Sequence, residues 1–202
     1  MSTAGRILYN TVSGAQRPPR WTQDREGKVP GPSGNPGAES QASAEEHNTR
    51  DKVLRVAIGS DHGGFEAKEL LKRYLAGLGY RITDVGCHSP ERVDYPDYAL
   101  AVARRVAGGE CERGIMIDGA GIGSSMVCNK VRGIRAALCY DLRTVVNSRE
   151  HNNANVLTLG GPLHGADELC EMARVWLETR FAGGRHWPRI NKMMAVERRT
   201  SL

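Results

Sequence analysis

Short β-rich runs and amphipathic segments alternate regularly along residues 53–193. The run at 53–60, VLRVAIGS, precedes the segment at 65–79, FEAKELLKRYLAGLG, in which hydrophobic residues recur three and four positions apart until Gly79 ends the pattern. This pair of patterns repeats along the range. Because parallel strands need a crossover between them, the alternation predicts a parallel sheet with helices on both of its faces.

Strands are expected at five places, namely 53–60, 80–86, 113–117, 134–140 and 154–160. The expected helices are 65–79, 97–110, a short one ending at Asn129, 141–152, 166–181 and a last one after Pro188. In open parallel sheets, ligands bind beyond the carboxyl ends of the strands. That rule predicts a site among four groups: Asp61 with His62, the loop at 118–124, Tyr140 with Asp141, and Gly160 with Gly161.

The composition of the chain changes sharply near residue 52. Residues 13–52 are rich in Gly, Pro, Ser and charged residues, which cannot bury enough apolar surface to offset the entropy of ordering, so they predict a flexible linker. We therefore predict an N-terminal extension at 1–52 and a globular domain at 53–202.

A small apolar cluster lies within the first twelve residues, at Ile7, Leu8, Tyr9 and Val12. Three interpretations remain open for it. It is a disordered tail, a docking peptide within residues 1–20 for a scaffold or protein shell, or an organelle transit peptide. The lack of acidic residues before Asp24 fits the third interpretation, which the prolines and the later acidic residues weaken.

The overall composition excludes several classes of protein. No segment approaches the roughly 20 consecutive apolar residues of a membrane span. A net charge of +5 and only two phenylalanines argue against a nucleic-acid platform. The five cysteines are widely spaced and include no CxxC pair, so we expect reduced thiols in a cytoplasmic protein rather than disulfides or a zinc site.

Two motifs follow predicted strands. GSDHGG, at 59–64, places Asp61 and His62 side by side on a glycine-flanked turn, where both can face a ligand; the simpler interpretation is a capping aspartate beside an incidental histidine. DGAGIGSS, at 118–125, offers successive backbone amides to an anion or oxyanion. It is neither a Walker loop nor a dinucleotide fingerprint, and a glycine loop alone is weak support for a site.

Two further motifs lie near the ends of helices. SREHNNANV, at 148–156, contains His151, with a plain helix C-cap and a left-handed Asn153 as the simpler interpretation. GGRHWPR, at 183–189, contains Arg185 and Arg189, which share one face of a helical turn and can grip a phosphate. The simpler interpretation of this motif is a solvated basic end.

These motifs, in this order, resemble the ribose-5-phosphate isomerase B and galactose-6-phosphate isomerase family. The similar stretches are IGSDHGGFEAKE, VDYPDYA, GIMIDGAGIGSSMVCNKVRGIRAALC, SREHNNANVLTLGG and FAGGRHWPRI, within residues 53–193. The resemblance implies an α/β fold, a three-layer α/β/α sandwich with a five-stranded parallel Rossmann-like sheet. It also implies a homodimer, often paired into tetramers, whose active sites are shared between two chains.

The activity implied by the resemblance is interconversion of an aldose phosphate and its ketose phosphate through an enediolate, with no metal and no cofactor. Asp61 and His151 are expected to assist ring opening. His62, Arg185 and Arg189 are expected to hold the phosphate, the arginines across the dimer. The amides of the loop are expected to stabilise the enediolate oxygen. The expected members of this oxyanion site are Gly119, Gly121, Ile122, Gly123 and Ser124, and the expected sugar-lining residues are Tyr95, Asn129 and Asn152.

The glycine loop departs from the pattern of the family at its first residue. Many ribose-5-phosphate isomerases of this type have a cysteine base at the position of Asp118, and others a glutamate at the position of Ile122. In one interpretation Asp118 is the catalytic base; in the other it is structural, and the chain is a weak, altered or inactive member. Cys128 is expected to pack in the interior. Two smaller departures are Ala120, where threonine is common, and Pro162, where some members have an arginine.

Ribose 5-phosphate is therefore the expected substrate, with ribulose 5-phosphate as the product. Two alternatives remain open: an isomerase for a tetrose or hexose phosphate, and a non-catalytic sugar-phosphate-binding subunit that partners an active paralogue. The N-terminal cluster before its linker is also compatible with an address to a bacterial microcompartment. No nucleic-acid or membrane partner is expected.

Overall fold

The computed structural model describes residues 53–199, and the predicted extension at 1–52 and its docking peptide lie outside them. The described part forms a five-stranded sheet in the order β2-β1-β3-β5-β4, and every paired strand is parallel. The strands are β1 (Arg55–Ser60), β2 (Arg81–Asp84), β3 (Arg113–Asp118), β4 (Ala136–Leu138) and β5 (Val156–Gly160). The predicted parallel α/β sheet is confirmed.

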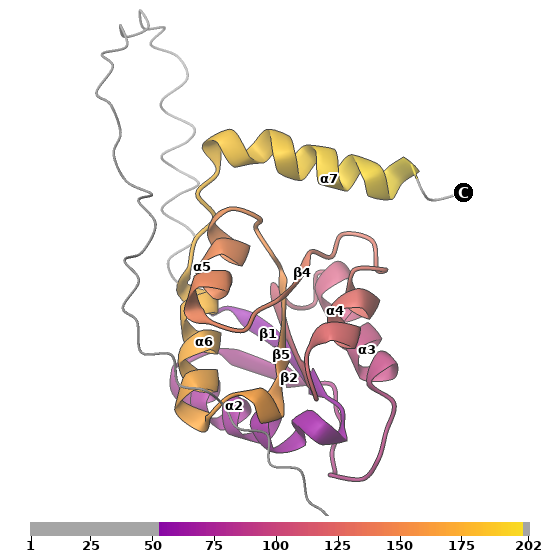
Figure 1. Ribbon diagram of the computed structural model, residues 1–202, viewed down its shortest axis with the longest axis vertical. Helices are drawn as coiled ribbons and strands as arrows, with labels where there is room; N and C mark the ends of the chain where they lie inside the picture. The colour runs from indigo at the N-terminus through magenta and orange to yellow at the C-terminus, as the bar shows by residue number, and fades with distance from the viewer. Residues whose placement is uncertain (1–52, 200–202) are drawn as a thin grey trace, which may run out of the picture. The chain divides into compact units, whose positions relative to one another are not determined.

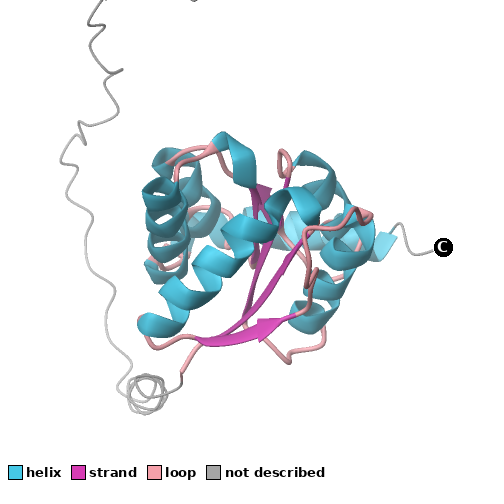
Figure 2. Ribbon diagram, turned by 90° about the horizontal axis from the view of Figure 1, so that it is seen from below, coloured by secondary structure: helices cyan, strands magenta, loops and turns pink. Residues whose placement is uncertain are grey.

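Helices cover both faces of the sheet (Figures 1 and 2). One face carries α2 (Phe65–Gly77), α5 (Leu142–Glu150) and α6 (Ala166–Glu178), and the other carries α3 (Tyr95–Ala107) and α4 (Ile122–Cys128). Three short 3-10 turns join these elements: η1 (His62–Gly64), η2 (Gly161–Leu163) and η3 (Gly184–His186). The last helix is α7 (Trp187–Arg199). The three-layer arrangement expected from the resemblance is therefore present.

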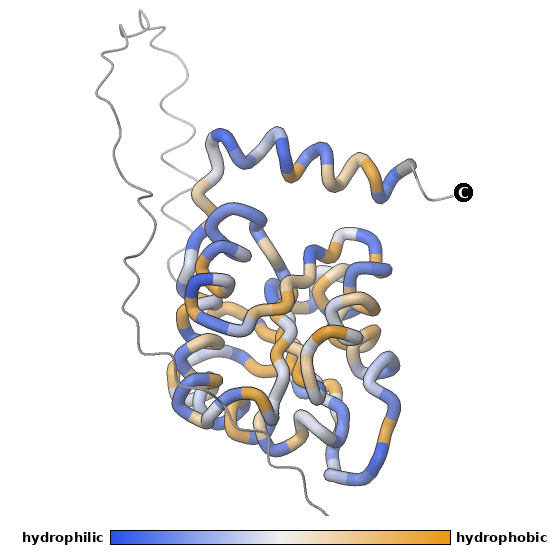
Figure 3. Tube along the Cα trace, viewed as in Figure 1, coloured by the Kyte–Doolittle hydropathy of each residue, from blue (hydrophilic) through white to orange (hydrophobic). Residues whose placement is uncertain are grey.

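Each face of the sheet has its own hydrophobic core. Under α2, α5 and α6, the buried side chains include Leu71, Leu157 and Trp176, and under α3 and α4 they include Val102 and Met116. Figure 3 shows the hydrophobic colours concentrated on the central strands and on the helix segments beside them. The continuous apolar runs of β1, β3 and β5 follow from this burial on both faces.

Local polar contacts fix where individual helices begin. The carboxylate of Asp141 accepts a hydrogen bond from the Thr144 amide at 2.7 Å, and the Thr144 hydroxyl accepts one from the Asp141 amide at 3.2 Å. This capping box starts α5. On α2, the fully buried ammonium of Lys68 donates to both carboxylate oxygens of Asp84, which ties the helix to the end of β2.

Some predicted boundaries are wrong by a few residues. The helix predicted at 166–181 ends at Glu178, because Thr179 adopts an extended conformation (φ −68°, ψ 122°). The chain then passes through Gly183 and Gly184, both at positive φ, which suits glycine, before α7 begins one residue ahead of Pro188. The strand predicted at 134–140 is reduced to the three residues of β4.

Helix α7 packs only partly against the rest of the domain. A carboxylate oxygen of Glu197 accepts a hydrogen bond from the Gly133 amide at 2.6 Å, and the thioether of Met194 lies 3.6 Å from the Arg135 guanidinium. Trp187 and Val196 keep 50% and 61% of their surface exposed. Within residues 53–199, no helix has both the length and the apolar character that crossing a bilayer requires.

A close approach of backbones at Gly64 generates a first prediction. A Cβ at this position would lie 2.3 Å from the carbonyl oxygen of Ile117 in β3, an atom that cannot move without disturbing the sheet. We expect Gly64→Ala to destabilise the domain by about 1–3 kcal/mol or more, as overpacking does. Urea unfolding measures the loss. The matched control is Gly77→Ala at the end of α2, where a Cβ meets nothing within 4 Å; equal stability of the two variants would contradict the prediction.

Candidate active site

The carboxyl ends of β1 and β3 form the centre of the candidate site. From β1 the chain moves to β2 on one side and then returns to β3 on the other, so the strand order reverses between β1 and β3. Such a reversal opens a crevice in which parallel sheets bind ligands. Asp61 follows β1, and Asp118 ends β3; the amide of Asp61 donates to the carbonyl of Ile117 at 3.2 Å. The predicted motifs at 59–64 and 118–125 therefore meet.

The carboxylate of Asp118 is saturated by donors from its own loop. Its Oδ1 accepts hydrogen bonds from the amides of Ala120, at 2.8 Å, and Gly121. Its Oδ2 accepts from the Ser124 amide, at 3.2 Å, and from the Ser124 hydroxyl. A carboxylate has about four lone-pair positions, so all of them are in use. With only 5% of its surface exposed, Asp118 holds the loop closed on itself.

Three other amides of the loop remain open. The N–H groups of Gly119, Ile122 and Gly123 have no acceptor within the described part of the chain. Gly121 separates them at a φ of 76°, a left-handed conformation that favours glycine, and a Cβ there would lie 2.5 Å from the Leu138 side chain. The predicted amide site is thus divided: Gly121 and Ser124 serve Asp118, whereas the other three can serve a ligand.

Asp61 differs from Asp118 in its surroundings. Its Oδ1 accepts one hydrogen bond, from the Gly64 amide at 3.0 Å, and so caps η1. Its Oδ2 has no partner among residues 53–199. The position of a Cβ on Gly63 lies 3.4 Å from Asp61 Oδ1 and 3.6 Å from the open Gly119 amide. Carboxylate and amide therefore flank a small space that Gly63 leaves empty.

The remaining predicted residues of this edge surround the loop. The ring of Tyr95, 37% exposed at the start of α3, lies over the loop, since a Cβ on Gly123 would approach its hydroxyl to 2.7 Å. His62 is exposed, and its Nδ1 lies within hydrogen-bonding distance of the backbone of Val93. The side chain of Ile122 is 45% exposed. Together with Asp61 and the open amides they form what we call the carboxyl-edge half-site.

His151 and Asn152 lie at the opposite edge of the sheet. They end α5, which returns from the carboxyl edge, and they precede Asn155, whose carbonyl accepts from the Gly114 amide at the start of β3. The six residues of β3 span the distance between the two edges, and their five steps of roughly 3.3 Å make about 17 Å. One chain therefore does not bring its predicted ring-opening residues, Asp61 and His151, together.

The segment before α7 joins His151 at this amino edge. The amide of Ala182 donates to the Glu150 carbonyl at 2.9 Å, and the rings of His151 and His186 stack with centroids 4.5 Å apart. Burial lowers the pKa of His186, and the neighbouring His151 lowers it further. The sequence motif contains His186, but its role as a stacking partner could not be read from spacing.

Arg185 and Arg189 are exposed beside this pair of histidines. The two arginines, His151, Asn152 and His186 form what we call the amino-edge half-site. The positive charges of the arginines also lower the pKa of His186. The amide of Asn152 donates to Asn147, whose side chain in turn lies 2.9 Å from His151 Nδ1. Cations and imidazoles on an open surface can receive a phosphate.

Asn129 and Cys128 both make contacts that support the fold. Asn129 exchanges two hydrogen bonds with the backbone of Ala136, at 2.8 and 2.9 Å, and so fixes the connection from α4 to β4. Cys128 is fully buried, and burial raises the pKa of its thiol to about 12, so it stays protonated. It packs in the interior, as expected. The simpler interpretation of the 148–156 motif also holds, since Asn153 has a φ of 46°.

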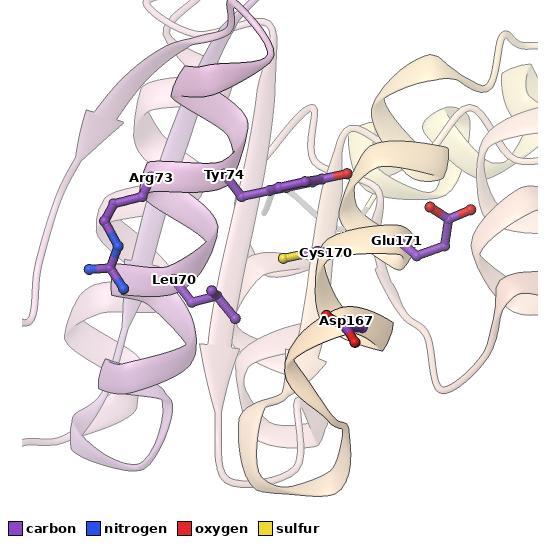
Figure 4. Close-up of a pocket in the computed structure, with 6 residues that line it drawn as sticks. All are labelled: Leu70, Arg73, Tyr74, Asp167, Cys170 and Glu171. Carbon is purple, nitrogen blue, oxygen red and sulfur yellow. The ribbon is translucent and has the colours of Figure 1, made fainter.

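Two pockets lie away from both half-sites. One lies between α2 and α6, where Tyr74, Leu70 and Cys170 face one another; Arg73, Asp167 and Glu171 complete its lining, and Arg73 and Glu171 point outward (Figure 4). The other lies between α7 and the connection from α4 to β4, and Asn129 is the one predicted site residue in its lining. In residues 53–199, no three His, Cys, Asp or Glu side chains gather as a metal site requires.

Residues 56–193 match the family described as Ribose/Galactose Isomerase. The chain belongs to this family. A putative sugar phosphate isomerase of Bacillus subtilis (strain 168), YwlF, is 45% identical over 145 residues, which are 71% of this chain and 97% of that protein. The ribose-5-phosphate isomerase B of Escherichia coli (strain K12) is 41% identical over 147 residues, 73% of this chain and 99% of that protein.

Solved structures agree with the family assignment. A structure of Clostridium thermocellum ribose-5-phosphate isomerase B has a TM-score of 0.72 and 45% identity, over 73% of this chain and all of that one. Another relative, from Pectobacterium atrosepticum, has a different sugar in its name, D-erythrulose-4-phosphate isomerase, and is 37% identical over 143 residues, 70% of this chain and 93% of that protein. The chain is thus of the sugar phosphate isomerase type.

The saturated carboxylate of Asp118 generates a second prediction. In Asp118→Asn, an N–H₂ group replaces one oxygen and faces donors, so buried N–H groups of the loop lose their acceptors. We expect a loss of about 1–3 kcal/mol in the free energy of unfolding, measured with urea. The control is Asp94→Asn, because Asp94 is an exposed N-cap that makes no side-chain cap bond. An Asp118→Asn protein as stable as this control would show that the carboxylate does not hold the loop.

Proposed function

We propose that the protein interconverts ribose 5-phosphate and ribulose 5-phosphate through an enediolate. The observation that carries this proposal is the Asp61 carboxylate, whose Oδ2 has no partner among residues 53–199, beside the open Gly119 amide at the same edge of the sheet. Removing a proton next to a carbonyl requires a base on the C–H side and preorganised donors at the oxygen that becomes negative. The carboxyl-edge half-site supplies both within one crevice.

Family membership supports the reaction class, and the names of the relatives support a phosphorylated sugar. Ribose 5-phosphate is the first choice because the Escherichia coli relative and the Clostridium thermocellum structure both have it in their names. A four-carbon sugar phosphate is the second, because a relative is named for D-erythrulose 4-phosphate. Residues at the rim, such as Tyr95 and Ile122, decide how long a sugar fits.

A second copy of the chain completes the site in this proposal. Asp61 and His151 lie at opposite edges of one sheet, so they can act on one substrate only if the two edges come from different copies. The exposed apolar side chains of α7, Trp187 and Val196, suit such an interface. A symmetric dimer makes two equal sites in this way.

The phosphate is then held mainly by the partner copy. Arg185 and Arg189 reach the substrate from the amino edge of one protomer, and His62 from the carboxyl edge of the other. Phosphate binding far from the reacting carbons contributes energy that positions C1 and C2 against the base. His151, on the arginines' side, assists opening of the sugar ring.

A non-catalytic sugar-phosphate-binding subunit is the second candidate. The saturated Asp118, which occupies the position of the base in many relatives, favours it. The open carboxylate of Asp61 and the retained His151 favour the enzyme. A substrate panel separates the two candidates.

Purified protein is expected to isomerise ribose 5-phosphate faster than tetrose and hexose phosphates, because the Escherichia coli relative and the Clostridium thermocellum structure are named for this substrate. Coupled assays or NMR on each sugar phosphate measure the rates. Turnover of a four-carbon substrate alone would transfer the activity to that class. Binding without turnover of any sugar phosphate would establish the non-catalytic subunit.

Mixed dimers test whether the site is shared. Asp61→Asn and His151→Gln are each expected to be inactive on ribose 5-phosphate, but a mixed dimer holds one site without either change. Co-expression is expected to restore about a quarter of the wild-type specific activity, since half of the dimers are mixed and each has one intact site. In the control, Asp61→Asn is co-expressed with Arg55→Lys, a change that lies outside both half-sites. The specific activity of this mixture shows how much activity comes from sites that carry neither Asp61→Asn nor His151→Gln. No recovery in the first mixture would place both residues in the same protomer's site.

A further inference from the structure

We propose that Asp61, and not Asp118, moves the proton between C1 and C2 of the sugar. This inference rests on the proposed isomerase function and assigns its base. Asp118 becomes a positioning residue that acts through the loop. The assignment reverses the first interpretation of the sequence, in which Asp118 was the base.

The contacts of Asp118 leave no oxygen free for a substrate proton. Both of its oxygens receive two donors each, from Ala120, Gly121 and Ser124. Taking up a proton would break at least one of these hydrogen bonds and leave a buried donor unpaired. The loop amides that donate to Asp118 cannot also donate to a substrate. Asp118 thereby selects which amides face the crevice, namely those of Gly119, Ile122 and Gly123.

Asp61 has the geometry that Asp118 lacks. Only one of its oxygens has a partner, the Gly64 amide. This hydrogen bond fixes the orientation of the side chain and leaves Oδ2 available as an acceptor. The surface of Asp61 is 8% exposed, against 5% for Asp118. A Cβ on Gly63 would lie 3.4 Å from Asp61 Oδ1, the oxygen that accepts from Gly64, and 3.6 Å from the Gly119 amide nitrogen, so the carboxylate and an open loop amide border the same point beside Gly63.

Other candidate bases fit less well. Cys128 is buried with its Sγ 3.3 Å from the Ala99 carbonyl, to which it donates. The Ser124 hydroxyl is fully buried and donates to Asp118. His62 faces solvent, and its Nδ1 is engaged with Val93. Among the described residues of the carboxyl edge, Asp61 therefore combines a free oxygen with a fixed position.

The step balances without any other reactant. From the ketose, Asp61 takes a proton from C1, the C–H electron pair becomes the C1–C2 double bond, and the C2 carbonyl pair moves to its oxygen. The open loop amides hold that oxygen. The proton then returns to C2 while the O1 proton passes to O2 and C1 becomes the aldehyde. Nothing is oxidised or reduced overall.

Ribulose 5-phosphate separates this step from ring opening. Its C5 oxygen carries the phosphate, so the sugar has no ring to open. In D₂O, loss of the C1 proton by exchange or conversion reports proton abstraction alone, and NMR follows it. We expect Asp61→Asn to lower this rate by about 10²–10⁴-fold, the usual contribution of a positioned base. Asn retains the oxygen that accepts from Gly64, so the fold persists.

Two variants give the contrast. His151→Gln, expected to affect ring opening, should slow ribose 5-phosphate far more than C1 proton loss. Asp118→Asn should lower C1 proton loss clearly less than Asp61→Asn does, because it disturbs the loop and leaves the base in place. The proposal is overturned if Asp61→Asn exchanges the C1 proton at the wild-type rate. It is also overturned if the rate falls only in folded Asp118→Asn or only in His62→Gln. If Asp118→Asn does not fold, Asp61→Asn alone decides.

A steric variant tests the same space without changing a charge. Gly63→Ala places a methyl group at ordinary contact distances from Asp61 and Gly119, so it should fold, yet it fills the gap. We expect C1 proton loss to fall at least tenfold, with unchanged urea stability, while Gly77→Ala stays at the wild-type rate. An active Gly63→Ala overturns the geometry. A wild-type protein inert on every sugar phosphate overturns the proposed function instead, so the two failures are distinct.

Discussion

The polarity of a parallel sheet governs how this protein builds a site. All carboxyl ends lie on one edge, and each crossover helix returns the chain to the other. Residues that follow strands, such as Asp61 and Asp118, therefore gather on one edge, and residues that follow a helix, such as His151, gather on the opposite one. The proposed sharing of the site between two copies is the consequence of this constraint, because no rearrangement of side chains spans the length of β3.

Asp61 and Asp118 show how surroundings give one residue type two roles. They end neighbouring strands, but one carboxylate meets four donors from its own loop and the other meets one. The saturated carboxylate orders the loop and leaves three amides open to the crevice. The less engaged carboxylate faces the gap at Gly63. In the proposed assignment, structural and chemical tasks are thus divided between two side chains at the same edge.

Much of the fold could be predicted because its periodicity is strong. The central strands are long, buried on both faces and uniformly apolar, and the helices between them have clear hydrophobic faces. Boundaries failed where contacts outside the local pattern take part: Asn129 binds the backbone of Ala136, where β4 begins, and Thr179 turns the chain out of α6 toward His186. In the site, two simple structural roles are confirmed, since Asp61 caps η1 and Asn153 is left-handed.

The order of strands and helices, the family and the set of polar residues in its motifs were all determined by the sequence alone, because periodicity and residue type are local properties. The tertiary structure decided which of those residues meet. It separated Asp61 from His151 by the length of the sheet, joined His151 to His186, and filled every lone pair of Asp118. These outcomes depend on distances between residues far apart in the chain and on competition among hydrogen-bond donors, and neither can be read from spacing.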